Sequence, residues 1–464
     1  MNIYRTEQDS LGPMQVPDDA LYGAQTARAL ANFPISGRPL SRPMLRALGL
    51  VKQYAARANR ELGLLPVAIA GAIIAAAQEV VAGELDSHFP VDVFQTGSGT
   101  SSNMNMNEVI ANRAAQLLGE QIGGKAVHPN DQVNLGQSSN DVFPTAIHIA
   151  CVEQLHNHLL PALKGMEVHL RLKAEEFADV LKIGRTHLQD ATPVRLGQVF
   201  NGYARQLELT RERLLFAADG LSELALGGTA VGTGINTHPQ FAELAIAGIA
   251  EETGIEFREA EDHFEAQSAK DGLVALSGAL KGCAVSLFKV ANDIRFLASG
   301  PRCWIDELEA PALQPGSSIM PGKVNPVLAE SMMQVCAQVS GNDATVTLCG
   351  LSGNFELNVM MPVMAENLLQ GIDLLGNVVD LFSERYLKEL EADRDRCDDL
   401  LDRSLALVTA LVPVIGYDKS AELAKRAYAE GKTIRELLLA EDILPESEVN
   451  RLLDAERMTE PTED

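Results

Sequence analysis

Residues 273–299 read LVALSGALKGCAVSLFKVANDIRFLAS, an apolar stretch with helical spacing and no proline. Small residues, among them Ala275, Ser277, Ala279 and Gly282, are interleaved with Leu and Val. Small side chains let the axes of two packed helices approach closely. The stretch therefore predicts a long helix that packs tightly against other helices.

Helical spacing of apolar residues recurs along most of the chain after Pro43. The first forty residues, rich in Pro and Gly, indicate an irregular arm, and strand signals elsewhere are few and short. Pro161 interrupts one helical pattern and predicts a kink or a break there. We therefore expect an all-α fold with a central bundle of long helices. The further helical patterns cover residues 152–170, 328–347, 365–387, 400–411 and 421–429.

The chain has 464 residues, which is too long for one compact core. A polar run near residue 138 and the Met361-Pro362 pair predict two boundaries. We expect an N-terminal, mainly helical domain over 1–138, a central long-helix domain over 139–362 and a small helical C-terminal domain over 363–464. Several helices are apolar on more than one face, which predicts that they pack across subunits in an obligate oligomer.

The net charge of −25 at pH 7 argues against a nucleic-acid partner, because phosphates would be repelled. A substrate carboxylate would likewise need cations and N–H donors close by. Six cysteines lie far apart without a CxxC or Cys/His spacing, which predicts a reduced, cytoplasmic protein. The longest uncharged apolar stretch, residues 67–77, is too short to span a bilayer, so no membrane partner is expected.

Four polar runs stand out in this otherwise apolar, helical chain. GSSIMPGKVNP at 316–326 contains two glycines and two prolines, which argue against a regular helix and suit a loop whose N–H groups can meet an anion. The other three are TGSGT at 96–100, QSSND at 137–141 and GRTH at 184–187. Taken singly, such a run is more typical of an ordinary turn. Four of them together favour a binding or catalytic site.

His187 is the first candidate for chemistry. Gly184 and Pro193 on either side of it predict a loop or a helix end, where functional groups gather. A carboxylate would orient the imidazole ring and raise its basicity, and Glu330 could provide one. A lone histidine is nevertheless more often structural than catalytic.

Ser317 and Ser318 are the second candidate. A serine hydroxyl is a poor base in water and needs N–H donors and a cation such as Lys323 to stabilise its alkoxide. The chain has no Gly-x-Ser-x-Gly motif, which weakens a hydrolase interpretation.

A third group could hold a small dicarboxylate at both ends, because it combines many hydrogen-bond donors with one positive charge. Each Ser or Asn in it could instead be only a helix cap. HPND at 128–131 consists of normal turn residues, and the glycine-rich run 227–234 lacks the lysine of a P-loop and indicates a tight crossover between helices. No metal-binding pattern and no GxGxxG motif are present, so we expect neither a metal nor a cofactor. The donor group comprises Ser98, Thr100, Ser138, Ser139, Asn140, Lys323 and Asn325.

Taken together, these motifs resemble the fumarase/aspartase superfamily. GSSIMPGKVNP at 316–326 is similar to the superfamily signature. Aspartases typically carry Gln at the position of His187 and Ala at that of Gly322, so the class II fumarases are the nearer resemblance. The motifs that resemble class II fumarase are GAQT at 23–26, TGSGT at 96–100, NMNMNE at 103–108, HPND at 128–131, QSSND at 137–141, GRTH at 184–187 and GYDK at 416–419.

The resemblance implies a metal-free hydratase that interconverts fumarate and (S)-malate by acid–base catalysis through an aci-carboxylate intermediate. It also implies a homotetramer in which the long helices form one multi-helix core and each active site draws on three chains. By motif position, Ser317 would be the base, and His187, paired with Glu330, the acid. The side chains that would hold the dicarboxylate are Ser98, Thr100, Ser138, Ser139, Asn140, Thr186, Ser318, Lys323 and Asn325, and a second, non-catalytic carboxylate site would comprise His128, Asn130 and Asp131.

Two alternatives stay open. The chain could be an aspartate ammonia-lyase (aspartase) with the same fold. It could also be a non-catalytic structural protein descended from a lyase, although the intact set of Ser317, His187, Lys323 and Glu330 speaks against this. Two positions depart from the resemblance: Leu135-Gly136 stands where many fumarases have Lys-Ser, and Val412 stands where Asn is common before the proline.

Overall fold

The computed structural model of the protein describes residues 4–124 and 126–461. Their contacts divide the chain into two compact units. The first unit comprises Met1–Pro161, Thr210–Ala284 and Val335–Gly376, and the second comprises Ala162–Leu209, Val285–Gln334 and Asn377–Asp464. The described residues are mainly helical, with short strands that pair only in two-stranded sheets. The expected helical fold with few strands is therefore confirmed, whereas the domain boundaries at 138 and 362 remain a prediction.

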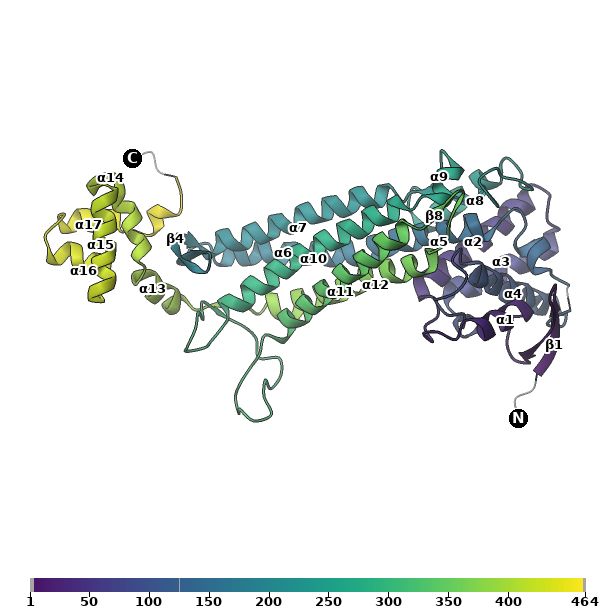
Figure 1. Cartoon of the computed structure of the whole chain (residues 1–464), viewed down its shortest axis with the longest axis horizontal. Coiled ribbons are helices and arrows are strands. Elements are labelled where there is room, and N and C mark those ends of the chain that lie inside the picture. Colours follow the sequence, from purple (N-terminus) through teal and green to yellow (C-terminus); the bar gives the residue numbers. More distant parts are fainter. Residues whose placement is uncertain (1–3, 125, 462–464) are drawn as a thin grey trace. The chain divides into compact units, whose positions relative to one another are not determined.

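Long helices make up much of the teal and green part of the chain in Figure 1. Helix α10 (Asp271–Leu297) is the long helix predicted from the proline-free stretch. By length and composition it could cross a membrane, but half of its apolar window is buried inside the protein, as in a core helix of a globular protein. The other long helices are α6 (Leu160–Glu176), α7 (Leu196–Asp219), α11 (Val327–Gly350) and α12 (Met361–Phe382).

The first unit is built around α2 (Arg42–Glu61). This helix packs against α3 (Val67–Ala82), α5 (Ser139–Gln154) and α8 (Phe241–Thr253), and α4 (Thr100–Leu117) packs against α3. Pro43 lies in the first turn of α2, where an N–H would have no partner within the helix. The core of this unit includes the fully buried side chains of Leu48, Ile73, Met106 and Phe143.

Two of the predicted helical patterns are interrupted. At Pro161, where a kink or a break was predicted, the backbone stays helical: α5 passes into a π-helical segment, Leu155–Leu159, and Pro161 lies in the first turn of α6. The single helix expected over 400–411 is wrong. Helix α13 (Arg394–Asp402) ends first, and the Ser404 hydroxyl accepts a hydrogen bond from the Ala406 N–H to begin a 3-10 helix, Leu405–Leu411.

The second unit contains the hairpin of β3 (Leu181–Thr186) and β4 (Gln189–Arg195), together with the short C-terminal helices drawn in yellow in Figure 1. Helix α13 packs on β3. The C-terminal helices have an apolar core of their own, in which Leu411, Leu438 and Val449 are fully buried. These helices are α14 (Val412–Ile415), α15 (Tyr417–Glu430), α16 (Ile434–Ala440) and α17 (Glu446–Leu452).

The arm expected at the N-terminus is more regular than predicted. β1 (Tyr4–Asp9) and β2 (Gly12–Pro17) form an antiparallel hairpin, which α1 (Ala24–Asn32) follows. The remaining short elements are α9 (His263–Ser268) and the strand pairs β5 (Glu223–Leu224) with β6 (Arg258–Glu259), β7 (Leu308–Glu309) with β10 (Glu391–Ala392), and β8 (Gly353–Asn354) with β9 (Leu357–Asn358).

Candidate functional site

The loop at 96–100 presents hydroxyls because its glycines let it pack closely. Gly97 lies against the backbone of Val359, where a Cβ atom would overlap the carbonyl oxygen. Gly99 has φ +73°, and a Cβ there would overlap the ring of Phe143. Side chains larger than hydrogen are therefore excluded at both positions, and the loop leads directly into α4.

Three hydroxyls of the first unit form a hydrogen-bonded row. Ser98 Oγ lies 2.7 Å from Thr100 Oγ1, which lies 2.7 Å from Ser139 Oγ. Ser98 lies in the loop before α4, Thr100 is the first residue of α4, and Ser139 is the first residue of α5. Residues separated by about forty positions in the sequence therefore meet, as expected for parts of one binding site.

The run QSSND begins α5. Ser138 is the helix cap, and its hydroxyl accepts from the Asn140 N–H at 3.2 Å. Asn140 donates to the carbonyl oxygen of Ala230 at 2.8 Å, which brings the glycine-rich run 227–234 to the start of this helix. The helix-cap interpretation is thus correct for Ser138 but does not account for the side-chain contacts of Ser139 and Asn140.

Asp141 holds the start of α5 in place. One carboxylate oxygen accepts from the Ser138 N–H at 2.8 Å, and the other accepts from the N–H groups of Gly227 and Thr229 at 3.1 and 2.9 Å. Burial raises the pKa of this carboxyl group, while the three N–H donors and the nearby Lys52 act in the opposite direction.

A cavity of about 650 Å³ lies beside the HPND turn. His128, Pro129 and Asn130 line it, together with Glu7, Glu108 and other residues of the first unit. The His128 Nδ1 accepts from the Asp131 N–H at 3.1 Å, and Pro129–Val133 forms a single π-helical turn. Asp131 does not line the cavity, so the structure places two of the three predicted second-site residues on its wall.

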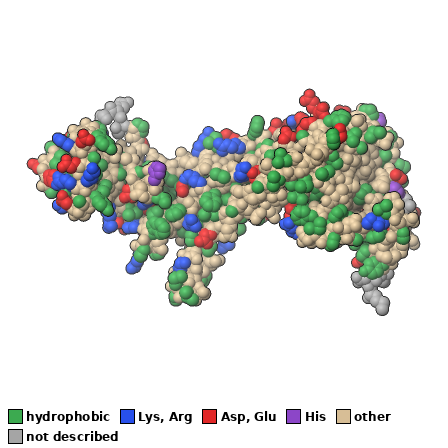
Figure 2. Space-filling view, viewed as in Figure 1, with side chains coloured by type: hydrophobic (Ala, Val, Ile, Leu, Met, Phe, Trp, Pro, Cys, Tyr) green, Lys and Arg blue, Asp and Glu red, His purple; other side chains and the backbone are tan. Residues whose placement is uncertain are grey.

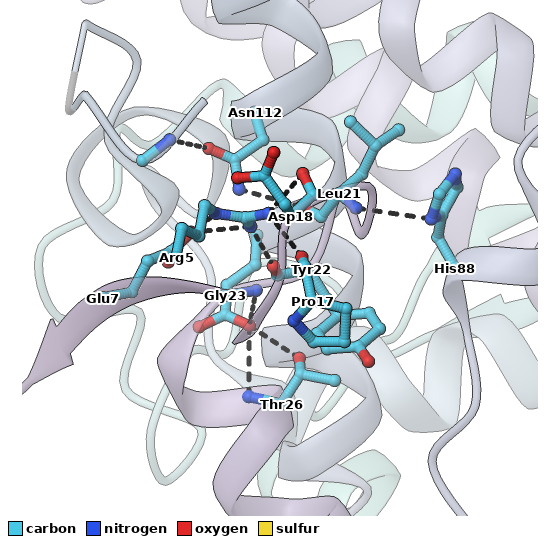
Figure 3. Close-up of polar contacts among 12 residues, drawn as sticks. Arg5, Glu7, Pro17, Asp18, Leu21, Tyr22, Gly23, Thr26, His88 and Asn112 are labelled. Atoms are coloured by element: carbon cyan, nitrogen blue, oxygen red, sulfur yellow. Dashed lines mark hydrogen bonds and ion pairs between the residues drawn. The ribbon is translucent and has the colours of Figure 1, made fainter. Parts of the chain in front are cut away.

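The carboxylate of Glu108 also lines this cavity. Figure 3 shows Gly23 and Thr26, two of the residues that donate hydrogen bonds to it. It accepts hydrogen bonds from the N–H groups of Gly23, Gln25 and Thr26 and from the Thr26 hydroxyl, at 2.6–3.1 Å. Arg5 donates to the carbonyl oxygens of Pro17 and Tyr22 in the same close-up, at 2.8 and 2.7 Å. The motifs GAQT and NMNMNE, which are far apart in the sequence, are thus joined by one buried carboxylate.

His187 lies at the tip of the β3–β4 hairpin in the second unit. His187 and Leu188 have φ values of 56° and 58°, the left-handed pair required by a two-residue hairpin turn. The expected loop is confirmed, but it connects two strands rather than lying at a helix end. Both side chains are exposed, and His187 also lines a cavity of about 450 Å³ with Arg185, Tyr203 and Phe296.

Arg185 anchors this hairpin. It makes a two-pronged hydrogen bond to Glu307, at 2.7 and 3.0 Å, and Lys182 Nζ lies 3.1 Å from the same fully buried carboxylate. A buried carboxylate between two cations is well compensated, and the two-pronged contact fixes its orientation. Glu307 was missed in the sequence, where no pattern distinguishes it from a surface glutamate.

The loop at 316–326 is closed by its own ends. The Gly316 N–H donates to the Lys323 carbonyl oxygen at 2.7 Å, and Asn325 Nδ2 donates to the Gly316 carbonyl oxygen at 2.8 Å. Ser317 Oγ accepts from the N–H groups of Ile319 and Met320, at 3.2 and 3.0 Å. These are the N–H donors that an alkoxide at this position would need. The predicted irregular loop is confirmed.

The structure thus divides the predicted site between the two units. The first unit brings Ser98, Thr100 and Ser139 into one hydrogen-bonded row, with Ser138 and Asn140 beside it. In the second unit, Glu330 lies in the first turn of α11, and no hydrogen bond or ion pair joins it to His187 within the described part of one chain. The second unit also carries Thr186, Ser317, Ser318, Lys323 and Asn325.

Comparison with known proteins decides the family. A lyase family model matches residues 12–341, and a model of the C-terminus of fumarase C matches residues 407–460. A class II fumarate hydratase of Halobacterium salinarum is 58% identical over 98% of this chain and 97% of its own length. This chain belongs to the class II fumarate hydratase family.

Other members of the class II family match almost as fully. The class II fumarate hydratase of Ralstonia nicotianae is 54% identical over 94% of this chain and 95% of its own length. The crystal structure of class II fumarase from Schistosoma mansoni has a TM-score of 0.96 at 39% identity and covers 98% of this chain and 99% of that one. A fumarate lyase:delta crystallin from Brucella melitensis, bound to cobalt, has a TM-score of 0.95 at 46% identity and covers 99% of this chain and 100% of that one. The fold is that of the fumarate lyases.

Over residues 4–124 and 126–461, no group of three or more His, Cys, Asp or Glu side chains is arranged to hold a metal ion. The side chains that the motifs select are instead hydroxyls, amides, a lysine and an imidazole, which recognise carboxylates and move protons.

Proposed function

We propose that this chain catalyses the reversible hydration of fumarate to (S)-malate. The observation that carries this function is the 58% identity to a class II fumarate hydratase over nearly the whole of both chains. The aspartase alternative is not favoured, since other relatives that match at full length are also fumarate hydratases and His187 and Gly322 are both present. We also propose a cytoplasmic location, in keeping with six free cysteines, five of them buried.

Ultraviolet absorbance of fumarate tests this function directly. With malate as the substrate, the purified protein should produce a rise in absorbance, and with fumarate it should produce a fall. Aspartate should give no change. Release of fumarate from aspartate would instead support the aspartase alternative, and inactivity with all three acids would support a structural protein.

The proposed mechanism begins at C3 of malate. Ser317, as its alkoxide, takes the C3 proton, and the electron pair left behind spreads into the neighbouring carboxylate to form the aci-carboxylate. Lys323, Asn325 and N–H groups would stabilise this added charge, an effect on the order of several kcal/mol when such donors are pre-arranged. The two N–H groups that donate to Ser317 Oγ support its role, because they favour the anionic form of the hydroxyl.

The second step removes the hydroxyl group at C2. His187, protonated and oriented by Glu330, gives its proton to the departing hydroxyl, which leaves as water. The electron pair of the aci-carboxylate forms the double bond of fumarate. In hydration the same imidazole takes a proton from water. Thr186, Ser318 and the residues Ser98, Thr100, Ser138, Ser139 and Asn140 would hold the two carboxylates during both steps.

We propose that the active site is assembled from three chains of a homotetramer, whose long helices form one core. Two observations support this arrangement. No hydrogen bond or ion pair joins His187, the proposed acid, to Glu330 within the described part of one chain. The long helices also expose large apolar side chains: Phe216 on α7 is 85% exposed, Val285 on α10 62% and Leu348 on α11 65%. Figure 2 shows hydrophobic side chains reaching the surface in many places.

Replacing Val285 with lysine tests the oligomer. We expect Val285→Lys to shift the tetramer toward smaller species in sedimentation and to lower turnover in parallel, because a charge at the apolar helix contact would be desolvated without a partner. Tyr428→Lys is the matched control, since Tyr428 is 80% exposed but lies on α15 in the separate C-terminal helical group. A monomeric wild-type protein with full activity would contradict the proposed assembly.

We further propose that His128, Asn130 and Asp131 form a second carboxylate site that takes no part in catalysis. The cavity beside the first two supports it. We expect His128→Asn to keep kcat within about twofold of wild type, because the side chain touches none of the row of hydroxyls. Steady-state kinetics with fumarate measures this. A loss of kcat comparable to that of a catalytic variant would place His128 in the mechanism.

We also propose that the chain has three domains, with boundaries near residues 138 and 362. Residue 138 is the cap of α5, and Met361 begins α12. Both are helix starts that follow irregular segments, as boundaries between domains commonly do.

A further inference from the structure

Lys52 is a buried cation in the middle of α2. It is fully buried, and it occupies the helical stripe that also contains Leu48 and Ala55. A methionine of similar length would fill this place without the desolvation of an ammonium group. The hydrogen bonds of a lysine here must therefore offset the desolvation of its ammonium group, and an apolar side chain could not make them.

Its hydrogen bonds go to two amides that precede the start of α5. Lys52 Nζ donates to Asn134 Oδ1 and to Gln137 Oε1, each at 2.9 Å. Asn134 Oδ1 also accepts from the side-chain amides of Asn103 and Asn107 on α4, at 3.2 and 3.1 Å. One oxygen is therefore held by donors from two helices.

Because their oxygens are occupied, these amides direct their N–H groups into the backbone. Asn134 Nδ2 donates to the Gln137 carbonyl oxygen at 3.0 Å. Gln137 Nε2 donates to the carbonyl oxygens of Val133 and Leu135, at 3.1 and 3.2 Å. These hydrogen bonds fix the turn over residues 133–137 from its buried side. Ser138 is the residue that follows the turn.

Asp141 fixes the residues that follow this turn. Its carboxylate accepts hydrogen bonds from the Ser138 N–H and from two N–H groups of the glycine-rich run 227–234. Ser138, Ser139 and Asn140 therefore lie in the sequence between a turn held by a buried ammonium group and a buried carboxylate. We propose that Lys52 is a positioning residue that sets the place of these three substrate-holding side chains through the amides of Asn134 and Gln137. The inference rests on the proposed role of Ser138–Asn140 in holding fumarate.

The electrostatic surroundings leave Lys52 close to its titration point at neutral pH. Burial lowers the pKa of its ammonium group to about 7, and the charge that opposes this shift comes from Asp141 on α5. Several acidic groups on the elements that pack against α2 have other partners. These pairs are Glu79 on α3 with Arg113, Glu252 on α8 with Tyr54, Glu153 on α5 with Arg46, Asp131 in the π-helical turn with His128, and Glu108 on α4 with Thr26.

Lys52→Met tests the proposal by separating KM from kcat. We expect the KM for fumarate to rise on the order of tenfold or more, as for the loss of hydrogen bonds from a charged donor, while kcat changes much less. The melting temperature should not fall in proportion to the rise in KM, since methionine puts an apolar side chain in place of a desolvated charge. Tyr54→Phe is the matched control: it removes a 2.9 Å hydrogen bond from another buried side chain of α2, one that points to a different side of the helix and goes to Glu252, and its KM should be unchanged.

Asn134→Asp provides a second test in a chain that keeps Lys52 and an acceptor oxygen for it, although it loses the Asn134 Nδ2 donor to the Gln137 carbonyl oxygen. A carboxylate at this position would raise the pKa of Lys52. In the wild-type protein, KM should increase as the pH rises through about 7, because Lys52 then loses its proton and donates more weakly. In Asn134→Asp this increase should move to higher pH by about one unit or more, and in Lys52→Met it should be absent.

The outcomes separate this inference from the proposed function. If wild-type protein turns over fumarate and Ser139→Ala raises KM, but Lys52→Met and Asn134→Asp leave KM and its pH dependence at wild-type values, the positioning role is wrong while the function stands. If Lys52→Met fails to fold, the pH dependence of KM in Asn134→Asp decides alone. If Tyr54→Phe raises KM as much as Lys52→Met does, the effect belongs to α2 in general and the proposal fails.

Discussion

Ser317→Ala is expected to lower kcat for fumarate hydration at least about a hundredfold, in line with typical acid–base contributions. The variant keeps the loop, because the closing contacts at Gly316, Lys323 and Asn325 do not involve this hydroxyl. It removes the oxygen that two N–H groups hold. Rates of malate dehydration and of exchange of the C3 proton with solvent should fall together, since both need the same base.

Ser318→Ala is the control one residue along. Ser318 is proposed to hold substrate, so its loss should appear mainly in KM. If Ser317→Ala turned over fumarate at nearly the wild-type rate, Ser317 would not be the base. If both variants lost kcat equally, the loop as a whole, and not the one hydroxyl, would account for the effect.

His187→Asn is expected to have an effect of similar size, at least about a hundredfold on kcat in both directions. Asparagine tolerates the left-handed backbone at this position, so the hairpin turn should survive. What is lost is the group that gives a proton to the leaving hydroxyl. Unchanged turnover in this variant would exclude the imidazole from the reaction.

The two inactive variants can be combined in mixed tetramers. If Ser317 and His187 of one active site come from different chains, mixed tetramers of Ser317→Ala and His187→Asn subunits would rebuild intact sites. Random mixing would restore about a quarter of them. If both residues came from the same chain, no mixture would recover activity. The experiment therefore distinguishes a wrong residue role from a wrong assembly.

The features that could be predicted from the sequence are those that depend on neighbouring residues. The proline-free stretch at 273–299 became α10, and the glycines and prolines of 316–326 formed an irregular loop. The hairpin at His187 could not be predicted, because a two-residue turn of this type usually contains Asn or Gly, and here His187 and Leu188 occupy it. Tertiary contacts, such as the Arg185 pair with Glu307, hold it instead.

Charges buried by long-range packing also could not be predicted from the sequence. Lys52 has the helical spacing of an apolar stripe, which is the one signal that could have indicated its burial. Its partners Asn134 and Gln137 lie more than eighty positions away and carry no pattern that pairs them with it. The pairing of His187 with Glu330 remains a prediction, since no hydrogen bond or ion pair joins the two within the described part of one chain.

The Glu108 carboxylate has a consequence for any shortened form of this protein. All four of its hydrogen-bond donors belong to residues 23–26. A version trimmed from the front through this segment would remove all four donors from this carboxyl group, and a buried acceptor left without its hydrogen bonds typically costs about 1–3 kcal/mol, or more if it is charged. The leading segment, for which the sequence predicted an irregular arm, therefore belongs to the folding unit, and tags or fusions should be joined ahead of it, never in its place.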